Sequence, residues 1–113
     1  MSLNKLEIVE HPLYEKAFKK LSKKFKNIEQ DVDAFLSSVH SPSDLGVELK
    51  CNVYKVRIAN SSKNKGKSAG YRLLTYVAMI ENELHLLYIY DKSSIGNLSE
   101  SEVDAMISSA LGN

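Results

Sequence analysis

Residues 84–90 constrain the fold most, because they are apolar on nearly both sides of an extended strand. The segment reads LHLLYIY, and aliphatic and aromatic side chains of this kind favour strands. A strand that must hide both of its faces needs covering layers on both sides. We therefore predict that residues 84–90 form a central strand of a sheet.

Two more strands are predicted directly before this central strand. Residues 54–58 alternate between apolar side chains and the cations Lys55 and Arg57, so one face enters the core and the other faces solvent. Residues 71–80 are mainly β-branched, aromatic or aliphatic, and the polar residues 81–83 indicate a turn. Three strands in succession favour an antiparallel meander.

Helices are predicted on either side of the meander in the sequence. A short strand over residues 5–10 is followed by Pro12, which suits the first turn of a helix. Apolar residues then recur every four positions, at Leu13, Ala17, Leu21 and Phe25. A second helix over residues 28–39 follows after only one or two residues, so the two helices are expected to pair as a hairpin. Ser99 and Glu102 form a capping box ahead of a third helix near the C-terminus.

The predicted element order is strand, helix, helix, strand, strand, strand, helix. This is the order of an α+β fold in which an N-terminal helix hairpin packs on a small antiparallel sheet. The chain has 113 residues, the usual size of one compact domain, so residues 1–113 are expected to form a single domain.

Cysteine content and hydropathy restrict the cellular setting. Cys51 is the only cysteine, so no internal disulfide can form, and no histidine or carboxylate cluster accompanies it at a spacing typical of zinc sites. The N-terminus lacks the apolar core of a signal peptide, and no apolar run approaches the roughly 18 residues that span a bilayer. We therefore expect a cytoplasmic protein without a membrane segment, a metal ion or a small-molecule cofactor.

Charge is distributed unevenly along the chain. The formal net charge is +1, yet residues 49–80 contain seven basic side chains and no acidic one. These are Lys50, Lys55, Arg57, Lys63, Lys65, Lys67 and Arg72. Residues 81–113 hold six acidic side chains against Lys92 alone. A basic segment in a nearly neutral protein indicates a polyanionic partner, and the RNA or DNA backbone is the first candidate.

Three segments of the chain carry a family resemblance through their order and spacing. They are YKVRI at residues 54–58, NKGKSAGYR at residues 64–72, and LYIYDK at residues 87–92 followed by NLS at residues 97–99. In this arrangement the chain resembles the RelE/HigB branch of the RelE/ParE toxin superfamily. The likeness extends over about residues 13–106 and is densest between residues 54 and 99.

The resemblance implies the toxin of a bacterial type II toxin–antitoxin system, which cleaves messenger RNA, usually on the ribosome, without a metal ion. It also implies that a cognate antitoxin covers the basic face and silences the toxin. The active residues of the family are lysines and arginines on the sheet and its loop. The positions that match are Lys55, Arg57, Lys65, Lys67 and Arg72, and Lys92 matches a lysine that recurs after the last strand.

The chain departs from the family pattern at several places. Asn64 and Ala69 replace two glycines of the usual basic loop, and both residues are tolerable there. Ser93 and Ser94 stand where many relatives have Asn and Glu. Some relatives place a catalytic or base-stacking tyrosine or arginine near the C-terminus, whereas no basic, aromatic or histidine residue follows Lys92 here.

RNA cleavage by attack of the 2′-hydroxyl needs a base, an acid and fixed positive charge for the phosphorane. An arginine guanidinium engages two phosphate oxygens and keeps its charge, so Arg57 and Arg72 are the candidate clamp. A lysine crowded by like charges can transfer a proton, so Lys55 and Lys67 are the candidate acid and base, in either order. The predicted RNA-binding residues are Lys50, Lys63, Lys65, Tyr76, Tyr90 and Lys92.

Other polar side chains are interpreted as structural. The lysines of the first predicted helix, from Lys16 to Lys24, read as a solvated face. The histidines lie in unrelated sequence contexts and receive no catalytic role; they are His11, His40 and His85. Strand tyrosines usually belong to the rim of the core, and base stacking is the functional alternative for Tyr76, Tyr88 and Tyr90.

Two other functions are left open by these patterns. A relative of the same fold can inhibit a protein target such as gyrase without cutting RNA, and the bare C-terminal helix favours that hypothesis. The third hypothesis is a nucleic-acid-binding module whose catalytic set has decayed. The dense basic pattern from Lys55 to Arg72 favours the ribonuclease.

Overall fold

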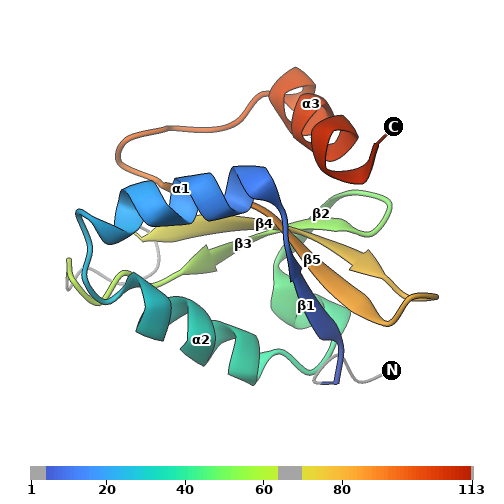
Figure 1. Cartoon of the computed structure of the whole chain (residues 1–113), viewed down its shortest axis with the longest axis horizontal. Coiled ribbons are helices and arrows are strands. Elements are labelled where there is room, and N and C mark those ends of the chain that lie inside the picture. Colours follow the sequence, from blue (N-terminus) through green and yellow to red (C-terminus); the bar gives the residue numbers. More distant parts are fainter. Residues whose placement is uncertain (1–4, 64–69, 113) are drawn as a thin grey trace.

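A five-stranded sheet organises the computed structural model, which describes residues 5–63 and 70–112 (Figure 1). The strands are β1 (Glu7–Glu10), β2 (Val47–Lys50), β3 (Val53–Ile58), β4 (Tyr71–Ala78) and β5 (Glu83–Asp91), in the order β1-β5-β4-β3-β2. The helices are α1 (Pro12–Ser22), α2 (Ile28–Ser38), the short 3₁₀ helix η1 (Pro42–Leu45) and α3 (Glu100–Leu111). The predicted α+β class and the order of the main elements are confirmed.

Strands β3, β4 and β5 form the predicted antiparallel meander, with β4 in the middle. Two edge strands extend it. β2 pairs antiparallel with β3, and β1 runs parallel to the first half of β5, where Glu10 lies opposite Leu86. β2 has no counterpart in the sequence prediction, because all of its residues are exposed and no buried face marks it.

Helices α1 and α2 cover one face of the sheet and lie in front of it in Figure 1. The side chains of β4 that point to this face belong to the same buried cluster as those of the two helices. Its sheet members include Tyr71, Leu73, Val77, Leu84, Leu86 and Ile89, and its helix members include Tyr14, Ile28 and Val32. No helix in the described part of the chain is long and apolar enough to cross a membrane.

Helix α3 covers only part of the opposite face. Its apolar side joins β3, β4 and β5 in a second cluster, whose buried members are Val53, Leu74, Leu87 and Val103. The N–H of Glu102 donates to Ser99 Oγ at 3.1 Å, and the N–H of Ser99 donates to Glu102 Oε1 at 2.9 Å. The predicted capping box is therefore confirmed at the start of α3.

The register between β4 and β5 shifts by one residue in the middle of the pair. Leu74 lies opposite Tyr88, but the next residue, Thr75, lies opposite Leu86, so Leu87 is an extra residue on β5. Leu86 is buried in the cluster under α1 and α2, whereas Leu87 is buried under α3. At this bulge two successive residues, Leu87 and Tyr88, face α3, and regular alternation after Tyr88 places Tyr90 on the same face.

The two N-terminal helices are connected by a longer segment than predicted. α1 ends at Ser22 and α2 begins at Ile28, so the expected connection of one or two residues was wrong. Phe25 lies in this connection and is 6% exposed, and the edge of its ring meets Tyr71 with 5.8 Å between the ring centroids. Its apolar side chain continues the helical period, which is why the sequence pattern did not reveal the end of α1.

Two histidines from distant parts of the sequence meet at the N-terminus of α1. His11 Nε2 lies 2.6 Å from His85 Nδ1, and His85 Nε2 lies 2.9 Å from Glu83 Oε1. The sequence-based interpretation of these histidines as unrelated was therefore wrong for His11 and His85. Only one proton fits between two facing ring nitrogens, so this arrangement excludes full protonation of both rings.

We expect the free energy of unfolding to fall as the pH is lowered from about 7.5 to about 5.5. Burial lowers the pKa of His11, the neighbouring His85 lowers it further, and Glu83 opposes both effects. In the unfolded chain His11 has its ordinary pKa of 6.5, so the unfolded state binds more protons in this window. Acid therefore favours unfolding, and urea titrations at several pH values measure the loss.

His11→Gln removes the facing imidazole and should make the free energy of unfolding less dependent on pH in this window. His40→Gln is the control, because His40 is exposed and outside the pair. If acid lowers the free energy of unfolding equally in the His11→Gln variant and the unchanged protein, the histidine pair is not the cause of the pH dependence.

Candidate nucleic-acid interface

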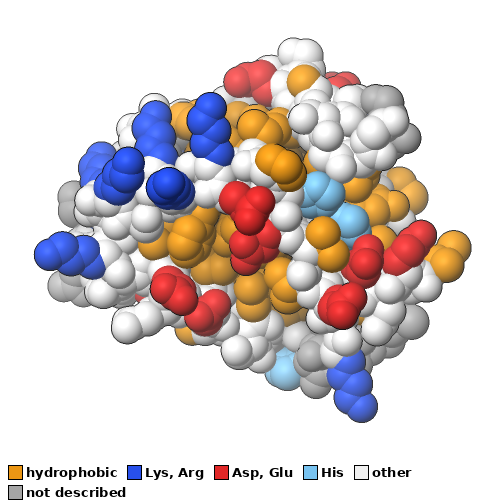
Figure 2. Space-filling view, viewed as in Figure 1, with side chains coloured by type: hydrophobic (Ala, Val, Ile, Leu, Met, Phe, Trp, Pro, Cys, Tyr) orange, Lys and Arg blue, Asp and Glu red, His pale blue; other side chains and the backbone are white. Residues whose placement is uncertain are grey.

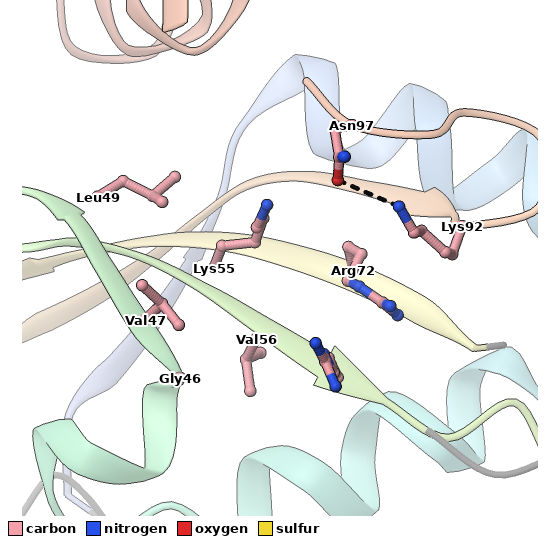
Figure 3. Close-up of a pocket in the computed structure, with 9 residues that line it drawn as sticks. Gly46, Val47, Leu49, Lys55, Val56, Arg72, Lys92 and Asn97 are labelled. Atoms are coloured by element: carbon pink, nitrogen blue, oxygen red, sulfur yellow. Dashed lines mark hydrogen bonds between the residues drawn. The ribbon is translucent and has the colours of Figure 1, made fainter. Parts of the chain in front are cut away.

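Four of the predicted site residues line one hollow on the face of the sheet that α3 leaves partly open (Figure 3). Lys55 and Arg57 come from β3, Arg72 comes from β4, and Lys92 directly follows β5. The hollow has a volume of about 490 Å³, and its other lining residues are Gly46, Val47, Leu49, Val56 and Asn97. No carboxylate is among the described residues that line it. We call this hollow the cation pocket.

The sheet register places the two arginines side by side. Arg57 lies directly opposite Arg72, and Arg72 lies opposite Tyr90 on its other side. Arg72 Nη1 donates to the carbonyl oxygen of Tyr71 at 3.2 Å. Burial lowers the pKa of the Arg72 guanidinium and Arg57 lowers it further, although a guanidinium stays charged in proteins. Like charges opposite each other on neighbouring strands repel, so a bound anion would relieve this repulsion.

Lys92 ties the segment after β5 to the cation pocket. Its ammonium donates to the carbonyl oxygen of Gly96 and to Asn97 Oδ1, the latter at 3.1 Å (Figure 3). Its backbone N–H donates to the carbonyl oxygen of Gly70 at 3.1 Å. Because a lysine ammonium can only donate, the amide of Asn97 must turn its oxygen toward Lys92. We call residues 92–99 the linker, and its residues Lys92 and Asn97 form one wall of the pocket.

Two glycines allow the backbone to approach β3 closely at this site. Gly46 has a φ of +89°, and a Cβ on it would lie 2.2 Å from the carbonyl oxygen of Lys55. A Cβ on Gly70 would lie 2.0 Å from the carbonyl oxygen of Ile58. Any side chain at these positions would push β2 or the start of β4 away from β3. The two glycines therefore help to fix the spacing of the strands that carry Lys55 and Arg72.

The other four basic residues of the prediction, Lys50, Lys63, Lys65 and Lys67, are not among the described lining residues of the cation pocket. The ammonium of Lys50 contacts Asp104 and lies 3.8 Å from Glu100, so Lys50 pairs with α3. Lys65 and Lys67 lie outside the described residues. Within the described part of the chain, no group of three or more His, Cys, Asp or Glu side chains is arranged to hold a metal ion.

A buried ion pair lies at the end of β5, on the face of the sheet that α1 and α2 cover. Asp91 is 1% exposed, and its Oδ1 accepts a hydrogen bond from Lys63 Nζ at 2.7 Å. Ser93 Oγ donates to the other carboxylate oxygen at 3.0 Å. Burial alone would raise the pKa of Asp91, but the hydrogen bonds from Lys63 and Ser93 outweigh it and hold the pKa below its ordinary value. The structure thus joins Lys63, a predicted RNA contact, to the strand end that precedes Lys92.

The predicted RNA-binding tyrosines occupy different environments. Tyr76 packs edge-on against His85 and lies under α3, away from the cation pocket. Tyr90 is 2% exposed beside Arg72, and burial raises the pKa of its phenol. Tyr88 is half-buried, and its ring lies against that of Tyr90 with 6.0 Å between the centroids.

Comparison with known proteins finds similarity in the fold. No family model and no curated protein sequence matches the chain. A structure of an arginine-to-alanine mutant of the E. coli toxin RelE in the free state aligns with a TM-score of 0.54 and 15% identity, covering 99% of this chain and 97% of that one. The chain has a RelE-like fold. The isolated E. coli RelE toxin also aligns, with a TM-score of 0.53 and 17% identity over 88% of this chain and 94% of that one.

A RelE-like fold at this level of identity does not by itself define an activity, because function depends on the residues of the site. Sequence reasoning missed two residues of the site region, Asn97 in the pocket wall and Asp91 behind it. Asp91 carries a signal that could have been used. A carboxylate that closes an apolar strand is buried and needs a cation, and the basic loop was the nearest source of one.

Asp91→Asn should lower the free energy of unfolding by about 3 kcal/mol, because removing one partner of a buried ion pair leaves the other charge uncompensated. Urea-induced unfolding measures this loss. Lys63→Met should destabilise the fold as well, and the double variant should lose less than the sum of the two single losses, since the side chains interact directly.

Asp33→Asn is the matched control, because Asp33 is an exposed carboxylate on α2. It should change the free energy of unfolding by no more than about 0.5 kcal/mol. If Asp91→Asn were as mild as this control, the ion pair would not be what holds the end of β5.

Proposed function

We propose that the chain is the toxin of a type II toxin–antitoxin system, an endoribonuclease of RelE/HigB type that cleaves messenger RNA on the ribosome. The cation pocket carries this proposal, because four cations surround a hollow of about 490 Å³ with no carboxylate among its described lining residues. Such a surface suits a phosphodiester, since charge-assisted hydrogen bonds to phosphate are strong. The RelE-like fold supports the choice, because the aligned structures are RelE toxins.

The proposed reaction is attack by the 2′ oxygen of a ribose on the adjacent phosphorus. A base takes the 2′ proton, the new oxygen–phosphorus bond forms, and the bond to the 5′ oxygen breaks while an acid protonates that oxygen. Arg57 and Arg72 clamp the phosphorane, whose extra negative charge their guanidinium groups stabilise. Lys55, which lines the same pocket, and Lys67 share the tasks of acid and base.

The proposed protein partner is a cognate antitoxin with an acidic segment. An acidic segment that folds onto the cation pocket would occupy the groups that bind phosphate and would exclude RNA. Charge complementarity also speeds association, which suits an inhibitor that must act before the toxin reaches a ribosome.

Arg72→Gln should reduce messenger RNA cleavage by about 100-fold or more, because it removes one preorganised charge from the transition state. Cleavage rates are measured in a bacterial translation extract by mapping the new 5′ ends of a reporter transcript. Lys26→Gln is the control, since it removes an exposed charge from the connection between α1 and α2. Equal rates for Arg72→Gln and the unchanged protein would contradict the clamp.

The function itself is tested by induced expression in growing bacteria with mapping of all transcript ends. Cuts within translated codons are expected. Growth arrest with intact transcripts and induced DNA damage would instead support inhibition of a protein target such as gyrase. One observation favours this second candidate, namely that no basic, aromatic or histidine residue follows Lys92 in the sequence.

A further inference from the structure

A second hollow of about 410 Å³ lies between α1, the end of β5 and the linker. We call it the tyrosine groove. Its lining includes the cations Lys20 and Lys24, the aromatic ring of Tyr88, and the side chains of Leu21, Ser94 and Ile95. It is separate from the cation pocket, but the two share a wall, because Lys92 and Asn97 of the linker line one and Ser94 and Ile95 line the other.

Tyr88 provides an aromatic surface in this groove, and the ring of Tyr90 supports it from behind. Its ring is half-buried, and Tyr90 packs against it at 6.0 Å with an angle of 28° between the rings. Tyr90 is itself buried and lies opposite Arg72 on the neighbouring strand. Leu21 and Ile95 add apolar walls from α1 and the linker. A flat ring between such walls is the usual composition of a base-binding site.

The charge of the tyrosine groove is positive. Lys20 lies in the last turn of α1 and Lys24 in the turn that follows the helix, and both exposed side chains line the groove. Figure 2 shows basic side chains gathered over α1, and the basic residues of this helix are all lysines. Asp91 is the one carboxylate among the described lining residues, and it is 1% exposed and paired with Lys63. An anionic ligand therefore meets two exposed cations and no exposed acid.

We propose that the tyrosine groove binds a nucleotide of single-stranded RNA, with its base on the ring of Tyr88 and its phosphate between Lys20 and Lys24. This inference rests on the proposed function, which places a neighbouring phosphodiester of the same strand in the cation pocket. The RNA crosses the linker at residues 92–95 to pass from one hollow to the other. The groove would then determine which conformation of the RNA reaches Arg57 and Arg72, because a stacked base fixes the position of one nucleotide.

Tyr88→Trp provides a direct readout, because the chain contains no tryptophan and the introduced one would report from the groove alone. The probe is an oligoadenylate of about six nucleotides, within the range that a single-strand-binding surface covers. Stacking of adenine should quench the tryptophan fluorescence. An abasic ribose-phosphate oligomer of the same length should bind without quenching.

Lys20→Gln combined with Lys24→Gln should weaken binding of the oligoadenylate to the otherwise unchanged protein by about fivefold and reduce the salt slope by about 1. Lys19→Gln combined with Lys23→Gln is the matched control. It removes the same charge from exposed positions in the last turn of α1 and the turn after it, outside the groove lining, and binding should stay within about twofold. Both lysine double variants change exposed side chains only, so they keep the fold. They therefore test the groove even if Tyr88→Trp disturbs the fold.

Equal effects of the two lysine double variants, or bound oligoadenylate without quenching, would overturn the groove as a nucleotide site. Quenching by an acidic peptide but not by oligoadenylate would overturn it too and would make the groove a protein-docking site. If binding depends on Arg72 but not on Lys20 and Lys24, the groove proposal fails while the proposed function stands. If the unchanged protein binds no RNA and cleaves none, both fail together.

Discussion

Burial of strand β4 on both faces is the constraint on which the rest of the structure depends. Every residue of β4 except Tyr76 is buried, and one of them is Arg72. Two layers are therefore required, and α1 and α2 supply one of them while α3 and the linker supply the other. Because α3 covers only one end of its face, the guanidinium of Arg72 lies beside an opening, and the cation pocket is that opening.

The fold divides the basic residues of the chain into two kinds. Lys50 and Lys63 form ion pairs with α3 and with the end of β5, so they stabilise the frame around the site. Lys55, Arg57, Arg72 and Lys92 converge on the pocket instead. Concentrating like charges costs stability, and proteins commonly accept such a cost at functional sites. The ion pairs behind the pocket offset part of it.

The sequence was sufficient wherever one face of an element is apolar and the other polar. Periodicity identified the meander and the helices, and alternation placed Lys55 and Arg57 on the open face. Periodicity did not identify β2, because all of its residues are exposed. It also did not predict that Lys63 pairs with the buried Asp91, because a basic loop residue has the same sequence pattern whether it faces water or a buried carboxylate. The meeting of His11 with His85 depends on the parallel pairing of β1 with β5, and no local pattern encodes that contact.

The extra residue at Leu87 also determines where β5 can lose or gain one residue. If residues 86–88 alternated regularly, with no bulge at Leu87, Tyr88 would face α1 and α2. Deleting that one codon would remove a leucine from under α3 but would leave each later residue on its present face. A one-codon insertion between Tyr88 and Asp91 would instead exchange the faces of the residues after it and bring Asp91 out of its buried site. Length variation among natural versions of β5 should therefore be tolerated at this position and rejected a few residues further on.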